Sequence, residues 1–273
     1  MTKSTPLSNP KLGKKSARKW AVAARFSDYF HVANLPTPPA VFGGPPPNLN
    51  WEGMLGNDRY GNCVCAGAAH ETIYWDTFSK NPITTFTAAC VLSDYSAVTG
   101  FNTNDPYSDE GTDMGVYASY RKKTGILDAH GKRHKVSGYL GLQVANINEL
   151  ILAAYLFNGV GFGFEFPSSA MSQFNSGSQI WSVVSKNSQI LGGHYVNVFG
   201  RNAAGNILLS TWGKTWSMTP QFAQYYNDET IAWVSVENIN AISQLNPEGL
   251  NIVQLLADLG QLPGTPNPKV SLE

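Results

Sequence analysis

Hydrophobic and polar positions change their spacing about halfway along the chain, from a helical period to strand alternation. Residues 63–78 form an alanine-rich stretch whose larger apolar positions continue at helical spacing, and residues 85–99 predict a second helix. The polar stretch FNTNDPYSDEGTDMGVYASYRKKTG then opens a third helix, with Thr112 or Asp113 as its N-cap and Gly125 after its end. The first half of the chain is therefore predicted to be helical.

The second half of the chain predicts mainly strands. NINELILAAYLFNG predicts a short amphipathic helix capped by Asn148, and VGFGFEFP alternates as a strand that Pro167 ends. HYVNVFGR, GNILLSTWG and ETIAWVSV predict three more strands, and GLNIVQLLADLGQL predicts a last helix before a proline-rich tail. Helices followed by strands predict an α+β protein rather than a repeated βαβ unit.

Composition and charge divide the chain into three parts. Residues 1–50 form a basic, proline-rich N-terminal arm with seven Lys or Arg and one Asp, a net charge of +6, so the rest of this neutral chain carries −6. Residues 51–240 form the predicted main domain, and residues 241–273 the last helix and tail. The arm is expected to contact its own body, an acidic partner or a phosphate backbone, or to remain a solvated leader.

The overall composition narrows the class of protein. A 14% share of charged residues and zero net charge argue against a general nucleic-acid binder. No run of 18 apolar residues predicts a membrane span, and no apolar segment near the start reads as a secretory signal. Three cysteines fit a reducing compartment better than a disulfide framework. We therefore expect a globular protein that is cytoplasmic or virion-associated, with no membrane partner.

Candidate chemistry centres on Cys63 in GNDRYGNCVCAGAAH. A thiol at a helix N-terminus feels the positive end of the backbone dipole, which favours the thiolate and makes it a nucleophile. Gly61 permits a tight turn into the helix, and the small residues after Cys63 let another layer approach closely. Asn57 and the Cys63 N–H are candidate donors to an oxyanion formed at the sulfur.

A thiolate nucleophile needs a base, and His194 is the strongest candidate among five histidines. In ILGGHYVNVFGR two glycines precede it at the start of an apolar strand, a rigid place from which to reach another element. The next predicted strand ends in LLSTWGKTW, so Ser210 is placed to orient the imidazole and Trp212 to shield it.

The motifs GNDRYGNC, GGHYVNVFG and STWG resemble those of the papain-like cysteine peptidases, in particular diverged forms from bacterial and bacteriophage genomes. His194 and Ser210 lie 131 and 147 residues after Cys63, within the spacing expected of that family's His and Asn. The resemblance covers about residues 50–236. It implies a helical half led by the Cys helix, an antiparallel β half, and a cleft between them that Gly111, Thr112 and Asp113 border.

The same resemblance implies hydrolysis of peptide or related amide bonds in peptide or protein substrates, with no cofactor and no metal. Cys63 would attack the carbonyl and His194 would protonate the leaving amine. The chain departs from the pattern at two supporting positions, because Asn57 replaces a Gln and Ser210 replaces an Asn. Tyr60 stands where the family has a disulfide cysteine. We therefore expect weakened or specialised catalysis, or none.

Other hypotheses stay open on the sequence. In a competing hypothesis the fold is an inactive scaffold or binding protein, for example in a phage particle, with the arm docking it to an acidic partner. Alternatively, residues 1–50 form an inhibitory pro-segment that is cut before Trp51. Cys65 is a weaker candidate nucleophile, and a zinc site built from Cys63, Cys65 and His70 or His194 lacks the usual cysteine spacing.

Overall fold

The computed structural model describes residues 10–18, 22, 24–29, 35–46, 53–235 and 238. The helix predicted at residues 249–262 and the tail lie outside these residues, as do residues 47–52 at the end of the proline-rich stretch. Within the described part, no helix is both long and apolar enough to cross a membrane.

The three helices predicted in the first half are present. They are α2 (Cys63–Ser79), α3 (Ala88–Thr99) and α4 (Met114–Lys123). Side chains cap two of them, because Thr87 accepts a hydrogen bond from the Cys90 N–H and Asp113 accepts one from the Val116 N–H. Of the two caps proposed for α4, Asp113 is therefore the correct one.

The helix α5 (Ile147–Phe157) also forms, but its cap is Asn146 rather than Asn148. Asn146 has an extended backbone and its side-chain oxygen accepts from the Glu149 N–H at 3.2 Å, whereas Asn148 already lies in the first turn. Sequence spacing does not separate two asparagines that stand two residues apart. The remaining helical elements are short: α1 (Phe26–Tyr29), η2 (Pro106–Ser108), α6 (Ser168–Asn175) and α7 (Pro220–Tyr226).

A seven-stranded sheet forms the other half of the fold. Its strands run in the order β3-β9-β4-β6-β7-β8-β5, and only the β5–β8 pair is parallel. The bounds are β3 (Val136–Gly141), β4 (Val160–Pro167), β5 (Ile180–Trp181), β6 (Ile190–Arg201), β7 (Ile207–Thr211), β8 (Lys214–Met218) and β9 (Asn227–Ser235). A separate pair joins β1 (Ile126–Leu127) to β2 (Arg133–His134). The strands predicted from alternation are β4, β6, β7 and β9.

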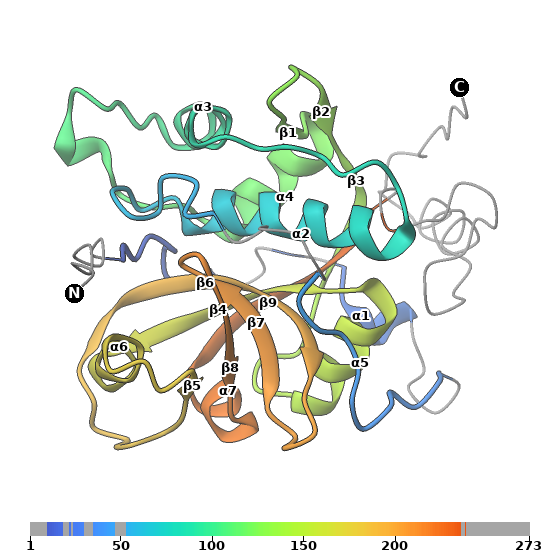
Figure 1. Cartoon of the computed structure of the whole chain (residues 1–273). Coiled ribbons are helices and arrows are strands. Elements are labelled where there is room, and N and C mark those ends of the chain that lie inside the picture. The colour runs from blue at the N-terminus through green and yellow to red at the C-terminus, as the bar shows by residue number, and fades with distance from the viewer. Residues whose placement is uncertain are drawn as a thin grey trace, which may run out of the picture.

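Both faces of the sheet are buried, which gives the molecule its layers. Figure 1 shows α2 lying along one side of the sheet with α3 and α4 beyond it, while α5, α6 and α7 lie on the other side. On β6, Tyr195 and Phe199 join the core with α2, whereas Val196 and Val198 join the opposite core. Strand alternation thus assigns each side chain of β6 to one layer.

Close packing of α2 on the sheet depends on its small residues. A Cβ added at Gly67 would lie 2.4 Å from the Tyr195 ring, so the absence of a side chain there admits the tyrosine. The expectation that small residues after Cys63 allow a close approach is confirmed. Cys63, at the start of the same helix, lies against the main chain of Tyr195.

A buried charge cluster ties these layers together. Glu71 of α2 accepts hydrogen bonds from the Tyr195 hydroxyl at 2.5 Å and the Trp233 indole at 3.2 Å, and it forms an ion pair with Arg121 of α4. The Arg121 guanidinium lies over the rings of Trp75 and Trp233. Burial raises the pKa of Glu71, and the charge of Arg121 opposes that effect.

Removing one member of this ion pair is expected to be costly, because the other charge stays buried without a counter-ion. We expect Arg121→Met to lower the free energy of unfolding by about 3–5 kcal/mol. The double variant Glu71→Leu/Arg121→Met should lose less, since it leaves no buried charge unpaired. Urea denaturation measures both, with Lys123→Met on the exposed side of α4 as the control. A single variant as stable as the control would contradict this assignment.

Candidate active site

Cys63 is the first residue of α2, where the helix dipole favours the thiolate. Main-chain groups of Val64, Tyr195 and Gly13 also lie at the sulfur and lower its pKa. Burial outweighs them, because the residue is only 3% exposed, and raises the pKa of the thiol to about 11. In this structure the thiol is therefore protonated at neutral pH, contrary to the thiolate expected from the helix position alone.

His194 lies in an aromatic environment on β6. Its ring stacks on Trp212 with the centroids 4.1 Å apart and an angle of 19° between the planes. The rings of Phe164, Phe166 and Trp181 surround it edge-on at 5.7–6.4 Å. This burial lowers the pKa of His194 to about 3, so the imidazole is neutral in this structure.

The hydroxyl at the imidazole belongs to Thr211 and not to Ser210, which corrects the sequence prediction. His194 Nε2 lies 2.8 Å from Thr211 Oγ1, whereas the buried Ser210 hydroxyl has no hydrogen-bond partner in the described structure. Strand alternation is the reason. Ser210 pairs in register with Asn197, on the face opposite to His194, and Thr211 projects to the face of His194. His194 Nδ1 is buried and has no hydrogen-bond partner within the described residues.

The ring that stacks on His194 comes from an unusual turn. Trp212 and Gly213 form the two-residue connection between β7 and β8, and both have positive φ, 44° and 70°. Two consecutive positive φ values are typical of the two-residue hairpin turn whose twist matches that of the flanking strands. A bulky residue such as Trp seldom adopts a positive φ. Trp212 stacks on His194 from this turn, and residues in such sparsely populated backbone conformations cluster at functional sites.

A segment of the N-terminal arm covers the thiol; we call residues 11–18 the cleft segment. Its Gly13 main chain lies against Cys63 and against Gly61. A Cβ added at Gly13 would lie 1.9 Å from the Gly61 carbonyl oxygen, so only glycine fits there. Figure 1 shows this stretch in dark blue beside the end of α2 where the helix begins.

Main-chain hydrogen bonds hold the cleft segment on both sides. The N–H groups of Gly13 and Lys14 donate to the Gly193 carbonyl of β6 at 3.1 and 3.0 Å. On the helical side, the Thr112 N–H donates to the Gly13 carbonyl at 2.7 Å, and the Thr112 carbonyl accepts from the Lys15 N–H at 2.9 Å. The segment therefore lies between the two halves of the fold and forms an isolated β-bridge to each, at Gly193 and at Thr112.

Asn57 and Trp212 converge on one carbonyl of the cleft segment. The Asn57 side-chain amide and the Trp212 indole each donate to the Lys11 carbonyl oxygen at 3.2 Å. Asn57 also donates to the Tyr60 carbonyl at 2.9 Å, which fixes the direction of its amide. One donor from each half of the fold thus holds the same peptide carbonyl oxygen.

The three residues expected to border the cleft all contact the cleft segment. A Cβ at Gly111, whose φ is +76°, would lie 2.2 Å from the Gly13 carbonyl oxygen. Thr112 forms the main-chain bonds already described, and Asp113 forms an ion pair with Arg18. Asn57, Cys63 and Trp212, predicted from separate motifs, therefore all contact one segment. His194 stacks on Trp212, and within the described residues no hydrogen bond joins its ring to the Cys63 thiol. Sequence reasoning missed Thr211 and the segment itself.

Charge pairing accounts for the basic character of this part of the arm. Lys14 pairs with Asp228, Lys15 with Glu110, and Arg18 with Asp113. Of the roles considered for the arm, contact with its own acidic body is the one that the described residues display. The opposite net charges of arm and body were the sequence signal for this contact.

Cys65 does not belong to the same chemistry. It is buried, and burial raises the pKa of its thiol, while the Tyr117 and Thr112 side chains lie beside it. In the part of the chain that the structure describes, no group of three or more His, Cys, Asp or Glu side chains is arranged to hold a metal ion. The zinc hypothesis thus has no supporting geometry among these residues.

Comparison with known proteins rests on structure, since no family model and no curated protein matches the sequence. Xylellain, a cysteine protease from Xylella fastidiosa, matches 85% of this chain and 100% of its own, with a TM-score of 0.59 and 16% identity. ProCathepsin B S9 from Trypanosoma congolense matches 81% of this chain and 86% of its own, with a TM-score of 0.53 and 12% identity. The α2 helix, the antiparallel sheet and these similarities together identify the fold as that of the papain-like cysteine proteases.

Proposed function

We propose that the protein is a cysteine peptidase whose thiol nucleophile is Cys63 and whose base is His194. The observation that carries this proposal is the cleft segment, because an extended peptide backbone lies across the thiol, bonded to both halves of the fold. A site that binds one peptide main chain in this manner suits a peptide substrate. The papain-like fold agrees with this chemistry.

In the proposed reaction His194 Nδ1 takes the proton of the Cys63 thiol, and the thiolate attacks the peptide carbonyl carbon. Hydrogen bonding from Nε2–H to Thr211 would leave the lone pair on Nδ1, the nitrogen without another partner. The imidazolium then protonates the leaving amine, and water hydrolyses the thioester. Asn57 and the Cys63 N–H are the proposed donors to the oxyanion.

In the covered form the pair is not ready for this step. Burial is the largest cause of both pKa shifts, and it acts in opposite directions on the thiol and the imidazole. Departure of the cleft segment admits water to Cys63, which lowers the thiol pKa towards its ordinary value. We therefore propose that this segment keeps the peptidase latent. The pro-segment hypothesis for residues 1–50 takes this form.

Displacing the cleft segment should expose a reactive thiol. We expect Gly13→Val, whose side chain collides with the Gly61 main chain, to raise the rate of Cys63 alkylation by iodoacetamide at least about tenfold near pH 7. Mass spectrometry of digested protein locates the label. Gly53→Ala is the matched control, because an added Cβ there meets only the Leu55 side chain at ordinary distance.

Addition of His194→Ala to Gly13→Val should remove most of this gain if the imidazole ionises the thiol. The buried Cys65 must remain unlabelled, which shows that the variant is folded. A Cys63 no more reactive than Cys90 in Gly13→Val would contradict the peptidase proposal and favour an inactive scaffold.

The pH dependence of the unmodified protein provides a second test. A thiol pKa raised to about 11 means that the proton is held until high pH. Alkylation of Cys63 should then rise about tenfold per pH unit from neutral pH to at least about pH 9.5, where an ordinary cysteine has levelled off. A rate that is already constant from pH 6 to 8 would show a preformed thiolate–imidazolium pair and refute latency.

The corrected partner of His194 is tested by two neighbouring variants in the Gly13→Val background. Thr211→Val removes the hydroxyl at Nε2 with little change of shape and should slow alkylation about fivefold near pH 6, the value of one net hydrogen bond. Ser210→Ala should leave the rate nearly unchanged, because its hydroxyl contacts no imidazole nitrogen. The opposite ranking would restore Ser210 as the orienting residue.

A further inference from the structure

One side chain of the cleft segment enters the body. The Lys14 side chain is 0% exposed, and its ammonium lies 2.6 Å from Asp228 Oδ2 and 2.9 Å from the Lys15 carbonyl oxygen. The other basic side chains that pair with the body, Lys15 and Arg18, are 43% and 60% exposed. Lys14 is therefore the residue of the segment that occupies a formed pocket.

Missing side chains create the room for the lysine stem. A Cβ added at Gly163 of β4 would lie 2.3 Å from Lys14 Cε and 2.6 Å from the Met114 sulfur, so the methylene groups pass over this glycine. Gly193 admits the main chain in the same way, since its Cβ would lie 2.3 Å from the Lys14 carbonyl oxygen. Gly163 and the Met114 side chain therefore form an apolar wall along the lysine stem.

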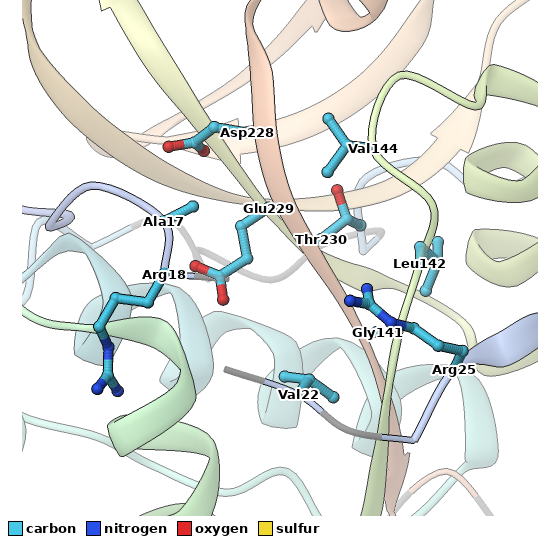
Figure 2. A pocket seen from close by; sticks show the side chains of 10 residues that line it. All are labelled: Ala17, Arg18, Val22, Arg25, Gly141, Leu142, Val144, Asp228, Glu229 and Thr230. Atoms are coloured by element: carbon cyan, nitrogen blue, oxygen red, sulfur yellow. The ribbon is translucent and has the colours of Figure 1, made fainter. Parts of the chain in front are cut away.

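The end of the pocket is acidic. Asp228 and Glu229 are the second and third residues of β9, and Figure 2 shows both carboxylates extending to the side of the strand on which Ala17 and Arg18 lie. The second carboxylate oxygen of Asp228, Oδ1, is buried and has no hydrogen-bond partner in the described structure. Asp228 also borders an open cavity of about 320 Å³ beside Glu229. Room and acceptor capacity thus remain for a second donor, as a guanidinium supplies.

The pocket lies one residue along the bound backbone from the residue that contacts the thiol. Gly13 lies at Cys63, and Lys14 is the next residue along the same bound backbone. We propose that the pocket selects a lysine or arginine side chain in bound peptides, at the residue next to the one that lies over Cys63, with Asp228 as the specificity-determining residue. This inference rests on the proposed function for its consequence in catalysis, but the pocket itself can be tested by binding.

Neutral side chains should bind worse for a physical reason. A norleucine in the pocket would fill the apolar walls but leave the largely buried Asp228 carboxylate without a counter-ion. Sites that leave a buried polar group unpaired reject the wrong ligand strongly. Norleucine has nearly the shape of lysine but no charge. The difference in affinity between peptides that carry one or the other therefore measures the charge interaction apart from packing.

The test uses the full chain carrying Gly13→Val, and Lys14→Glu as a second variant that repels the segment from Asp228. Fluorescence anisotropy measures binding of the labelled peptide Lys-Leu-Gly-Lys-Lys-Ser and of the same peptide with norleucine or arginine at its fourth position. We expect the lysine and arginine peptides to bind at least about tenfold more tightly than the norleucine peptide. Asp228→Asn should remove this difference, whereas Asp105→Asn, the same change at an exposed site, should preserve it.

A parallel measurement separates the two proposals. Bromoacetyl-Lys-Lys-Ser and bromoacetyl-norleucyl-Lys-Ser amides are compared for their rates of Cys63 alkylation in the same variants. Their electrophilic carbon takes the place of the Gly13 Cα, and the tested side chain follows it as Lys14 follows Gly13. Tight lysine-dependent binding without alkylation would retain the pocket and overturn the peptidase. Alkylation without a lysine preference would retain the peptidase and overturn the pocket. Equal binding of the lysine and norleucine peptides, or a preference that survives Asp228→Asn, would refute the role of Asp228.

Discussion

The buried carboxylate of Glu71 is the constraint on which the rest of the structure depends. It joins α2 to β6 through Tyr195, to β9 through Trp233 and to α4 through Arg121. Because Tyr195 directly follows His194, the same bonds that secure the layers set the imidazole strand against the helix that begins with Cys63. A charge cluster within the interior thus fixes the register between the two halves. Cys63 lies at one end of that fixed interface, whereas the His194 ring projects from the other face of β6, among Phe164, Phe166 and Trp181.

A single physical cause, removal of water, then controls the candidate pair. Burial raises the thiol pKa and lowers the imidazole pKa. It therefore disfavours the thiolate and the imidazolium, the two charged groups that the active form needs. Gly13 takes part in this burial because it has no side chain and rests directly on the Gly61 main chain. The departures from the papain-like pattern at Asn57 and Ser210 do not leave the site without these hydrogen bonds. Asn57 donates to the segment, and Thr211, the residue after Ser210, bonds His194.

Local patterns were sufficient for much of this structure. The small residues of α2 and the alternation of β4 are each visible in a short stretch of sequence. The pairing of Cys63 with His194 was predicted from the number of residues between them. Errors arose where two similar residues stand close together. Asn146 and Asn148 differ only in backbone conformation, and Ser210 and Thr211 differ only in the face to which strand pleating sends them. The cleft segment needed a contact between residues far apart in sequence, for which the opposite charges of arm and body were the only sign. Short elements such as β5 and α7 carry too few residues to display a period.

Covalent attachment gives the cleft segment an advantage that no free peptide shares. A tethered ligand competes at an effective concentration that is commonly millimolar, whatever the concentration of the protein. Dilution therefore does not vacate the cleft, and a peptide arriving from solution has to exceed that local concentration or bind more tightly than KLGKKSAR does. Cutting the chain between Arg18 and the body would abolish the advantage at once, because the severed piece would then diffuse away.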